Sequence, residues 1–340
     1  MLSAVLEEFH ADLALKELPI PVPGRGEVLI KVKASGLCAT DLHIQDGRLP
    51  AIRPPYVPGH ETAGIIAAIG EEIKDVRIGD SVIVALDILC GHCRYCQTGR
   101  GNLCRNLVRL GFERNGGHEE YMVAPARNVL KFDSTKVSFE KAAIIPDAVA
   151  CMYHAIRNKG DVRALDTVCL LGIGGLGFQG IQIAKYFGAT VFCTSRQQKK
   201  LDFALSMGAD CGINTAVDDV VEKINELTHN EQCDVVFDNI GTLQSVQTAL
   251  DICRPGGKVV LVGYSEDIYQ VQYQGMVMKE KEIIGIRGSN RRDLAETIWL
   301  VESGAVDPFV SNVYPLRDIN QAMAALRAGK SMGRTVLVMD

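Results

Sequence analysis

The sequence predicts an α/β protein of two domains, in which a β-rich domain is followed by a doubly wound parallel sheet. Two patterns and the chain length support this prediction. The first third carries short apolar runs separated by glycine and proline turns. The second half alternates continuous apolar runs with amphipathic stretches, as strands and helices of a parallel sheet do. With 340 residues, the chain is long enough for two packed cores.

The composition favours a protein that acts on small molecules in a reducing compartment. A net charge of −5 argues against nucleic acid or an anionic membrane as the main partner. The N-terminus resembles no signal peptide, and no apolar run reaches the ~18 residues of a transmembrane helix. We therefore expect a cytoplasmic protein, with its eleven cysteines present as thiols or metal ligands.

In the first domain, residues 28–33 alternate apolar and charged side chains, as a half-buried strand does. A proline- and glycine-rich turn at residues 19–24 precedes this strand. Residues 64–70, 80–85 and 120–125 continue the β pattern. These short strands predict a compact antiparallel sheet.

Over residues 138–158, the spacing of the apolar residues changes from that of strands to that of helices. Ser138 is a candidate N-cap, and residues 149–156 predict a helix. Residues 167–171 form an apolar run typical of a parallel strand buried on both faces. A glycine turn, an amphipathic helix and a strand at residues 190–194 follow, and the turn contains Gly172, Gly174, Gly175 and Gly177. This order is typical of a dinucleotide site, in which the pyrophosphate lies at the helix N-terminus.

The alternation continues to the end of the predicted sheet. We expect helices near residues 199–207, 218–228 and 243–252, and strands at residues 211–213, 234–238, 258–263 and 283–286. The tail predicts helices at 294–303 and 319–327 and a strand at 334–338. The predicted domains are residues 1–150 with 290–340, and residues 151–289.

One loop contains four cysteines at spacings that suit a single metal ion. Two, two and seven residues separate Cys90, Cys93, Cys96 and Cys104. Four thiolates close a tetrahedral shell, so this spacing indicates a structural zinc. An iron–sulfur cluster or four unligated thiols are the alternatives, although the C-x3-C-P continuation of ferredoxins is absent.

A second group of candidate ligands lies between residues 38 and 61. Cys38 and His60 offer the thiolate and imidazole donors that zinc prefers, and the same stretch contains Thr40, Asp41, His43 and Glu61. A catalytic zinc keeps one open position, so a third protein ligand must come from elsewhere. For the pair alone, a buried cysteine and a satisfied core histidine would be the simpler interpretation.

Together these motifs resemble those of the zinc-dependent, medium-chain alcohol dehydrogenase family. The matching stretches follow the family order over essentially the whole chain, and they are residues 36–43, Gly59-His60-Glu61, the four-cysteine loop, the glycine turn and residues 254–259. The resemblance implies a GroES-like catalytic domain with a Rossmann domain inserted before its last piece. It also implies one catalytic and one structural zinc per chain, and a homodimer or homotetramer.

The resemblance places the third ligand of the catalytic zinc six residues before the tyrosine of a Tyr-x-Ala motif. Here Tyr153 is that tyrosine, so the ligand position is Asp147, where relatives often carry cysteine. Several branches of the family use a carboxylate at this position. Cys151, on the same helix face as Asp147, remains an alternative, as does a site without a third protein ligand.

The resemblance also implies roles for the neighbouring residues. Thr40 would contact the substrate oxygen and pass its proton through the cofactor ribose to His43. Asp41 would hydrogen-bond the distal nitrogen of His60 and fix its tautomer, unless it forms only an ion pair or a cap. Glu61 matches a residue that alternates with water on the metal in some relatives, or that lies beside it without ligating.

The cofactor is expected to be NADP(H) in preference to NAD(H). No acidic residue lies where an NAD enzyme holds the ribose 2′-hydroxyl. Ser195 takes that position, Arg196 follows, and Lys200 lies in the same window, which suits a 2′-phosphate. An ordinary surface arginine would also explain Arg196. By resemblance, Arg334 matches an arginine that contacts the pyrophosphate.

Two stretches depart from the family pattern. Residues 286–293 are shorter than the usual loop, which lines the nicotinamide side or a subunit contact. His118 follows the Gly116-Gly117 turn, where relatives often carry an aromatic residue. We expect His118 to be a solvated turn residue rather than part of the substrate cleft.

The predicted function is therefore a zinc alcohol dehydrogenase or carbonyl reductase, which transfers a hydride between a zinc-bound alcohol and NADP(H). A polyol, sugar or amino-alcohol dehydrogenase of the same superfamily is the nearest alternative. A zinc-free reductase is disfavoured because Cys38 and His60 would then have no purpose. A non-catalytic cofactor-binding or redox-sensing protein is a remote alternative, since both Thr40 and His43 are present.

Overall fold

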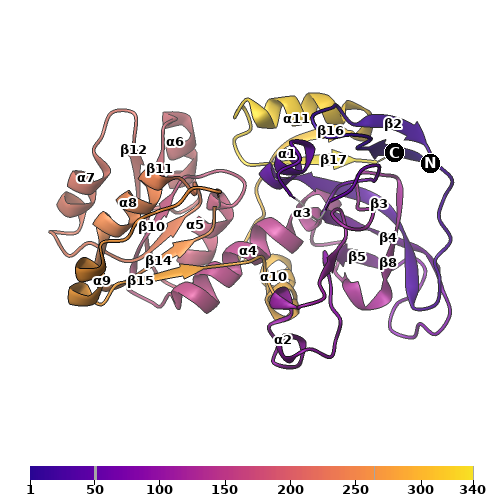
Figure 1. Ribbon diagram of the computed structural model, residues 1–340, viewed down its shortest axis with the longest axis horizontal. Helices are drawn as coiled ribbons and strands as arrows, with labels where there is room; N and C mark the ends of the chain where they lie inside the picture. Colours follow the sequence, from indigo (N-terminus) through magenta and orange to yellow (C-terminus); the bar gives the residue numbers. More distant parts are fainter. Residues whose placement is uncertain (50–51, 264, 340) are drawn as a thin grey trace. The chain divides into compact units, whose positions relative to one another are not determined.

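The computed structural model describes residues 1–49, 52–263 and 265–339, and it divides into two compact units (Figure 1). The first unit comprises Met1–Ala150, Ser289–Gly304 and Pro308–Asp340, and the second comprises Cys151–Gly288 and Ala305–Asp307. Sequence analysis assigns Ala305–Asp307 to the first domain. These residues join the second unit because Asp307 and Gln182 exchange two hydrogen bonds of 2.8 Å.

The first unit is built on a seven-stranded sheet in the order β16–β17–β3–β4–β5–β9, with β8 paired to β3. Its strands are β3 (Glu27–Leu37), β4 (Glu61–Ile69), β5 (Ser81–Val84), β8 (Tyr121–Pro125), β9 (Val129–Lys131), β16 (Val310–Pro315) and β17 (Arg334–Val338). Two small antiparallel pairs are added, β1 (Leu2–Val5) with β2 (Ala14–Glu17) and β6 (Asp87–Ile88) with β7 (Val108–Arg109). Sequence analysis predicts a strand at β17 but none at β16. These two strands are parallel because helix α11 (Ile319–Arg327) connects them as a crossover.

Strand β3 lies at the centre of this sheet and pairs with β4, β8 and β17. Its side chains at Val28, Ile30 and Val32 are fully buried in the apolar core, as the alternation predicts. Strand β3 ends one residue before Cys38, and β4 begins one residue after His60. Because Gly36 of β3 pairs with Glu61 of β4, the strand pairing brings Cys38 and His60 to the same end of the sheet.

The helices of the first unit are α1 (Ala39–Gln45), α2 (Arg94–Gln97), α3 (Phe139–Ala143), α10 (Arg291–Glu302) and α11, with 3-10 turns η1 (Gly101–Leu103), η2 (Ala126–Asn128) and η5 (Leu316–Asp318). Sequence analysis predicts no helix directly after Cys38, where α1 forms. Helix α11 holds the end of α1, because the Arg327 guanidinium donates to Asp46 at 2.7 Å and to Gln45 at 2.8 Å. Residues 50 and 51, farther along, lie outside the described residues.

The helix predicted at residues 149–156 is only partly α-helical. It contains α4 (Ala150–Tyr153), with the π-helical segments η3 (Ile145–Val149) before it and η4 (His154–Gly160) after it. Pro146 lies in the first turn of η3, where it has no N–H to donate. The wider π-helical turn is a feature often found at functional sites.

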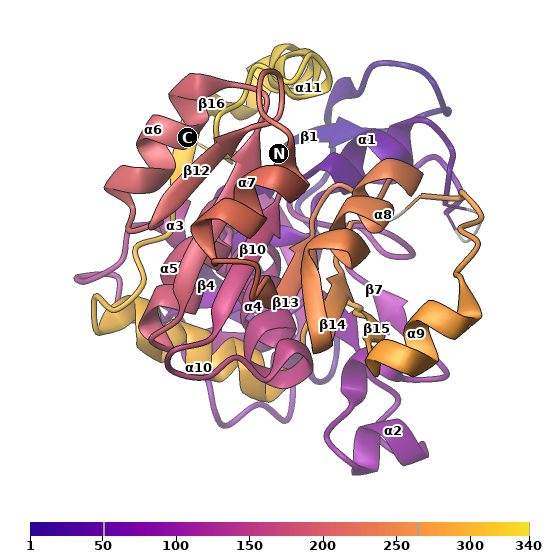
Figure 2. The ribbon, with the colours of Figure 1, turned by 90° about the vertical axis from the view of Figure 1, so that its left-hand side faces the viewer.

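The second unit contains a six-stranded parallel sheet in the order β12–β11–β10–β13–β14–β15. Its strands are β10 (Thr167–Leu171), β11 (Thr190–Ser195), β12 (Cys211–Asn214), β13 (Cys233–Asp238), β14 (Cys253–Leu261) and β15 (Glu282–Gly285). Its helices are α5 (Gly177–Tyr186), α6 (Gln198–Ser206), α7 (Val220–Leu227), α8 (Leu243–Ile252) and α9 (Tyr273–Lys279). Helices α7 and α8 pack together over this sheet (Figure 2). Numbered within the unit, the strand order is 3-2-1-4-5-6, that of a doubly wound dinucleotide-binding domain.

Within the described residues, no helix is long and apolar enough to cross a membrane. All eleven cysteines lie in this part of the chain, and each is a free thiol.

Because β3 carries the core of the first unit, truncation of Ile30 is expected to destabilise the fold. Ile30→Ala should lower the free energy of unfolding by about 2–5 kcal/mol, since a fully buried side chain is replaced by a cavity. The matched control is Ile78→Ala, because Ile78 is 65% exposed and should change stability by less than about 0.5 kcal/mol. Urea unfolding followed by circular dichroism measures both, and an equal midpoint for the two variants would contradict the predicted packing.

Candidate functional site

Four candidate ligand residues converge at the end of β3 and β4, namely Cys38, His60, Glu61 and Asp147. Their donor atoms all lie within 4.8 Å of one another. Cys38 Sγ lies 3.6 Å from Asp147 Oδ2, and His60 Nε2 lies 3.9 Å from the same oxygen. Sulfur, nitrogen and oxygen ligands of a tetrahedral zinc lie about 3.4–3.8 Å apart, so the donor set fits a zinc ion. Among the described residues, this group includes Asp147 but not the alternative Cys151.

Local structure explains how these side chains meet. Strand pairing brings Cys38 and His60 together, whereas Asp147 comes from the π-helical segment η3. Thr40 lies on α1, with its Oγ1 3.5 Å from Cys38 Sγ. His43 lies three residues farther along the same helix, and therefore on the same face as Thr40.

Arg334 lies beside this group and binds its two carboxylates. Its guanidinium Nε donates to Glu61 Oε2 at 3.1 Å, and Nη2 donates both to Glu61 Oε1 and to Asp147 Oδ2, the latter at 2.8 Å. Arg334 is 5% exposed. The residue that the resemblance assigns to the pyrophosphate thus contacts the candidate metal site. Glu61 is held through both oxygens, while Cys38, His60 and Asp147 supply the three donors that a site with an open position requires.

The pKa values of the four candidate ligands shift in different directions. Burial raises the pKa of Glu61. Burial opposes the charged imidazole of His60, but the neighbouring Asp41 and Cys38 raise its pKa.

Burial opposes the thiolate of Cys38, but Arg334 and His60 together outweigh it and lower the pKa of the thiol. Burial also opposes the carboxylate of Asp147, and here Arg334 and His60 lower the pKa. In turn, burial disfavours the charge on Arg334, but the surrounding acidic groups raise its pKa. A thiolate and a carboxylate are the forms that bind a metal.

The other side of His60 faces Asp41 and Phe112. His60 Nδ1 lies 3.4 Å from Asp41 Oδ1, and the Phe112 ring packs 5.1 Å from the imidazole centroid. Asp41 is 2% exposed, and its Oδ2 accepts a hydrogen bond from the Cys38 backbone N–H at 2.8 Å. Burial opposes the carboxylate, but His60 and His118 together lower the pKa of Asp41. Asp41 thus lies beside the ring nitrogen of His60 that the sequence analysis expects it to contact.

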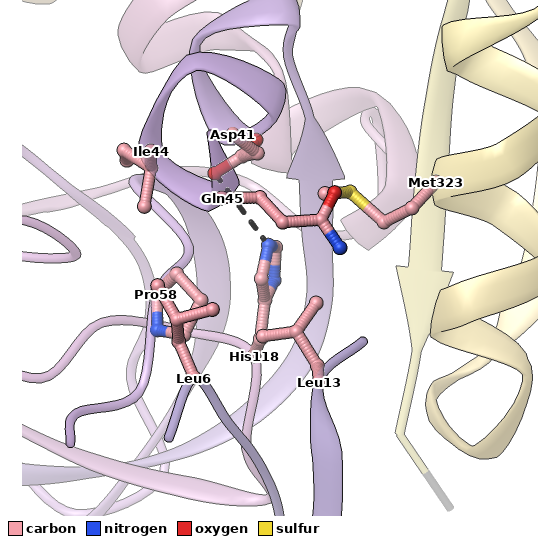
Figure 3. A pocket seen from close by; sticks show the side chains of 8 residues that line it. All are labelled: Leu6, Leu13, Asp41, Ile44, Gln45, Pro58, His118 and Met323. Carbon is pink, nitrogen blue, oxygen red and sulfur yellow. Dashed lines mark ion pairs between the residues drawn. The ribbon is translucent and has the colours of Figure 1, made fainter. Parts of the chain in front are cut away.

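His118 is fully buried, so its predicted place as a solvated turn residue is wrong. Its backbone C=O accepts from Ala4 N–H at 2.9 Å and its N–H donates to Pro58 C=O at 3.0 Å, which draws it inside the unit. Its side chain points toward Asp41, with Nε2 3.8 Å from Oδ1 (Figure 3). The alternation of β8 could not have revealed this burial, because it does not extend back to residue 118: Glu119 is buried and Glu120 is half-buried.

The four-cysteine loop forms a second candidate metal site. Its sulfur atoms lie 3.5 Å apart for Cys93 and Cys96, 3.9 Å for Cys90 and Cys96, and 4.0 Å for Cys93 and Cys104. Four sulfurs around zinc at about 2.3 Å are about 3.8 Å apart, so the loop fits a closed four-thiolate site. Backbone N–H groups of Cys96 and Arg105 lower the pKa of Cys93 to about 6, which favours its thiolate.

In the second unit, the glycine turn joins the carboxyl end of β10 to α5. Gly172 adopts a φ of 81°, and its N–H donates to Thr194 Oγ1 at 3.0 Å. A Cβ at Gly177 would lie 2.7 Å from Gly172 C=O, so a side chain there would separate the helix from the strand. Nothing lies within 4 Å of a Cβ built on Gly174, which leaves room for a ligand. Together with Gly175, these glycines fit a pyrophosphate at the N-terminus of α5.

Strand β11 ends at Ser195, where the ribose of a dinucleotide is recognised in this fold. Ser195 Oγ accepts a hydrogen bond from the Gln197 N–H at 3.1 Å, and Arg196 is exposed. Burial and the nearby Arg196 lower the pKa of Lys200. This end of the strand therefore presents a hydroxyl beside two basic side chains.

Comparison with known proteins shows the family to which the chain belongs. Residues 24–134 match the model of the alcohol dehydrogenase GroES-like domain, and residues 175–303 match that of the zinc-binding dehydrogenase. An alcohol dehydrogenase of Geobacillus stearothermophilus is 35% identical over 343 residues, covering 100% of both chains. An L-threonine 3-dehydrogenase of Yersinia pseudotuberculosis is 32% identical, covering 96% of both.

Solved structures show the same similarity. An NAD-dependent alcohol dehydrogenase superposes with a TM-score of 0.93 at 28% identity, covering 100% of both chains. A protein of Sinorhizobium meliloti solved with bound NADP has a TM-score of 0.92 at 28% identity, covering 99% of this chain and 98% of the other. The chain therefore belongs to the zinc-dependent, medium-chain alcohol dehydrogenase family, and it is an NAD(P)-dependent oxidoreductase.

Proposed function

We propose that this protein is an NADP(H)-dependent alcohol dehydrogenase or carbonyl reductase, with a catalytic zinc bound by Cys38, His60 and Asp147. The convergence of these three donors around one point carries the proposal. A zinc bound there supplies a Lewis acid that polarises an alcohol or carbonyl oxygen at the open position. We further propose a structural zinc in the four-cysteine loop.

The proposal assigns proton transfer to α1. Thr40 is partly exposed and lies beside Cys38 Sγ, so its hydroxyl can accept a hydrogen bond from a bound alcohol and relay the proton toward His43 by releasing its own. His43 is half-buried on the same helix face. Burial and the charge of Arg48 lower the pKa of His43, which keeps the imidazole neutral and able to accept that proton. In carbonyl reduction the proton moves in the opposite direction.

Ser195, Arg196 and Lys200 support NADP(H) as the hydride donor and acceptor. A planar guanidinium binds phosphate through two parallel hydrogen bonds, and a hydroxyl can donate to the same group. The carboxylate that an NAD enzyme places at this strand end would repel a 2′-phosphate, and Ser195 stands in its place.

A polyol, sugar or amino-alcohol dehydrogenase is the second candidate, favoured by the similarity to L-threonine 3-dehydrogenase. We also infer a cytoplasmic homo-oligomer. Eleven free thiols suit a reducing compartment. Within the described residues, β15 ends the sheet of the second unit without a further neighbour, and such an edge can pair with a second copy of the chain.

Asp147→Ala is expected to remove the catalytic zinc and to spare the zinc of the four-cysteine loop. The zinc content measured by metal analysis should fall from two ions per chain to one. The kcat/KM for alcohols should fall by at least about 100-fold, since loss of a group that only hydrogen-bonds a metal ligand already lowers activity by about 10–100-fold. Asp12→Ala, at an exposed carboxylate of the same unit, is the matched control. Two zinc ions and full activity in Asp147→Ala would refute the assignment.

Arg196→Ala is expected to raise KM for NADPH by about 10-fold or more, because a charge-assisted hydrogen bond contributes about 1.5–3 kcal/mol. KM for NADH should change by less than about 3-fold, since that cofactor lacks the 2′-phosphate. Initial rates with both cofactors, on a panel of alcohols, ketones, polyols and amino alcohols, measure this difference and rank the two candidate functions. Lys223→Ala, at an exposed ion pair of α7, is the control. An equal rise for both cofactors would contradict a 2′-phosphate contact.

A further inference from the structure

The buried imidazole of His118 takes part in none of the steps proposed above. Its Nδ1 lies 3.0 Å from Ser35 Oγ, and neither residue is exposed. Its Nε2 lies 3.8 Å from Asp41 Oδ1, and the two side chains point toward each other (Figure 3). His118 and the candidate ligand His60 thus approach the same carboxylate oxygen of Asp41.

The backbone holds His118 firmly in this place. Its C=O accepts from Ala4 and its N–H donates to Pro58, two residues before His60. Gly59 has a φ of 103°, and a Cβ there would lie 2.6 Å from His118 Nδ1. The imidazole therefore packs directly against the backbone that carries His60, at a position where only glycine leaves room for it.

Three buried polar atoms meet between these residues. Asp41 Oδ1, His60 Nδ1 and His118 Nε2 have no hydrogen-bond partner within the part of the chain that the structure describes. They face one another, with Oδ1 3.4 Å from the first nitrogen and 3.8 Å from the second. Buried polar groups in native proteins are almost always paired. Asp41 Oδ1 is an acceptor and each ring nitrogen can carry a proton, so the three atoms can serve as partners for one another.

Most of the side chains around these atoms are apolar. Leu6, Leu13, Pro58 and Met323 line the small pocket beside them (Figure 3). Gln45 also lines it, but its Nε2 donates to Ala11 C=O at 2.9 Å, and its Oε1 accepts from Arg327. The apolar walls strengthen a hydrogen bond formed within them, because water does not compete.

The proton positions are consistent along the whole chain of contacts. If Ser35 Oγ–H donates to His118 Nδ1, the neutral ring carries its proton on Nε2, which points toward Asp41 Oδ1 at 3.8 Å. Asp41 Oδ1 can accept from His60 Nδ1–H, and Oδ2 already accepts from Cys38. The lone pair of His60 is then on Nε2, which faces Asp147.

We propose that His118 is a positioning residue of the zinc centre, which together with Ser35 orients Asp41 and thereby fixes the ring and tautomer of His60. The inference rests on the proposed zinc site. His118 touches neither metal nor substrate in this arrangement, and it acts only through Asp41. Loss of a group that orients a metal ligand through a hydrogen bond, as Asp41 orients His60 here, typically changes metal affinity by about 10–100-fold.

The test measures the rate of zinc release from the full-length, zinc-loaded protein to the chromogenic chelator 4-(2-pyridylazo)resorcinol. The two zinc ions are expected to be released in two kinetic phases. The phase that is missing in Asp147→Ala belongs to the catalytic zinc, and the remaining phase, from the four-cysteine loop, is an internal control. His118→Phe keeps an aromatic ring but removes both nitrogens. We expect it to release the catalytic zinc about 10–100-fold faster and the loop zinc at an unchanged rate.

Two further variants separate hydrogen bonding from packing. His118→Gln retains an N–H donor and should restore most of the wild-type rate. Leu13→Ala opens the same pocket without removing a polar atom, and should leave the release rate of the catalytic zinc within about 2-fold of wild type. Ser35→Ala should accelerate release as His118→Phe does, and it decides the question if His118→Phe fails to fold.

The outcomes distinguish a positioning role of His118 from a packing role, and both from the absence of the catalytic zinc. If His118→Phe releases the catalytic zinc at the wild-type rate, the positioning role is overturned while the zinc site remains. If His118→Phe does not fold, a wild-type rate in Ser35→Ala overturns the role in the same way. Equal acceleration of both zinc phases, or acceleration in Leu13→Ala to the same extent, would assign His118 to packing alone and also overturn it. A wild-type protein that lacks the Asp147-dependent phase would instead refute the proposed function, and the inference with it.

Discussion

The pairing of β3 with β4 is the constraint on which the candidate zinc centre depends. Its register places Gly36 opposite Glu61, so Cys38 and His60 emerge side by side although a helix and a long loop separate them in the chain. A shift by one residue would turn every side chain to the opposite face. A side chain at Gly36 would collide with Glu61, so this glycine also enforces the close approach of the two strands.

Arg334 provides the charge that allows a thiol and two carboxylates to share one buried site. It reaches them because β17 pairs with β3, with Thr335 opposite Leu37. Two buried carboxylates without a cation would repel each other and lose hydration that nothing replaces. The guanidinium holds both oxygens of Glu61 and one oxygen of Asp147. Both oxygens of Glu61 are therefore engaged by Arg334. Asp147 also lies close to Cys38 and His60, where it can act as a metal ligand.

Local patterns in the sequence predicted the parts of the structure that depend on neighbouring residues. The strand alternation of β3, the glycine turn and the four-cysteine loop each lie within one short stretch. What depends on distant contacts was not predictable in this way. Helix α1 is only seven residues long and depends on Arg327 of α11 for its anchorage. The parallel pairing of β16 with β17 and the burial of His118 likewise depend on partners far along the chain. Asp147 was found only through the family resemblance, because no spacing connects it to Cys38.

Diffraction from crystals of the zinc-loaded protein, measured on both sides of the zinc absorption edge, tests the central claim most directly. The account predicts two anomalous peaks per chain. One should lie within the four-cysteine loop, and the other at about 2.3 Å from Cys38 Sγ and about 2.0–2.2 Å from His60 Nε2 and an oxygen of Asp147, with Glu61 still bound to Arg334. A single peak at the loop, or a second zinc that is not bound by Asp147, would contradict the account.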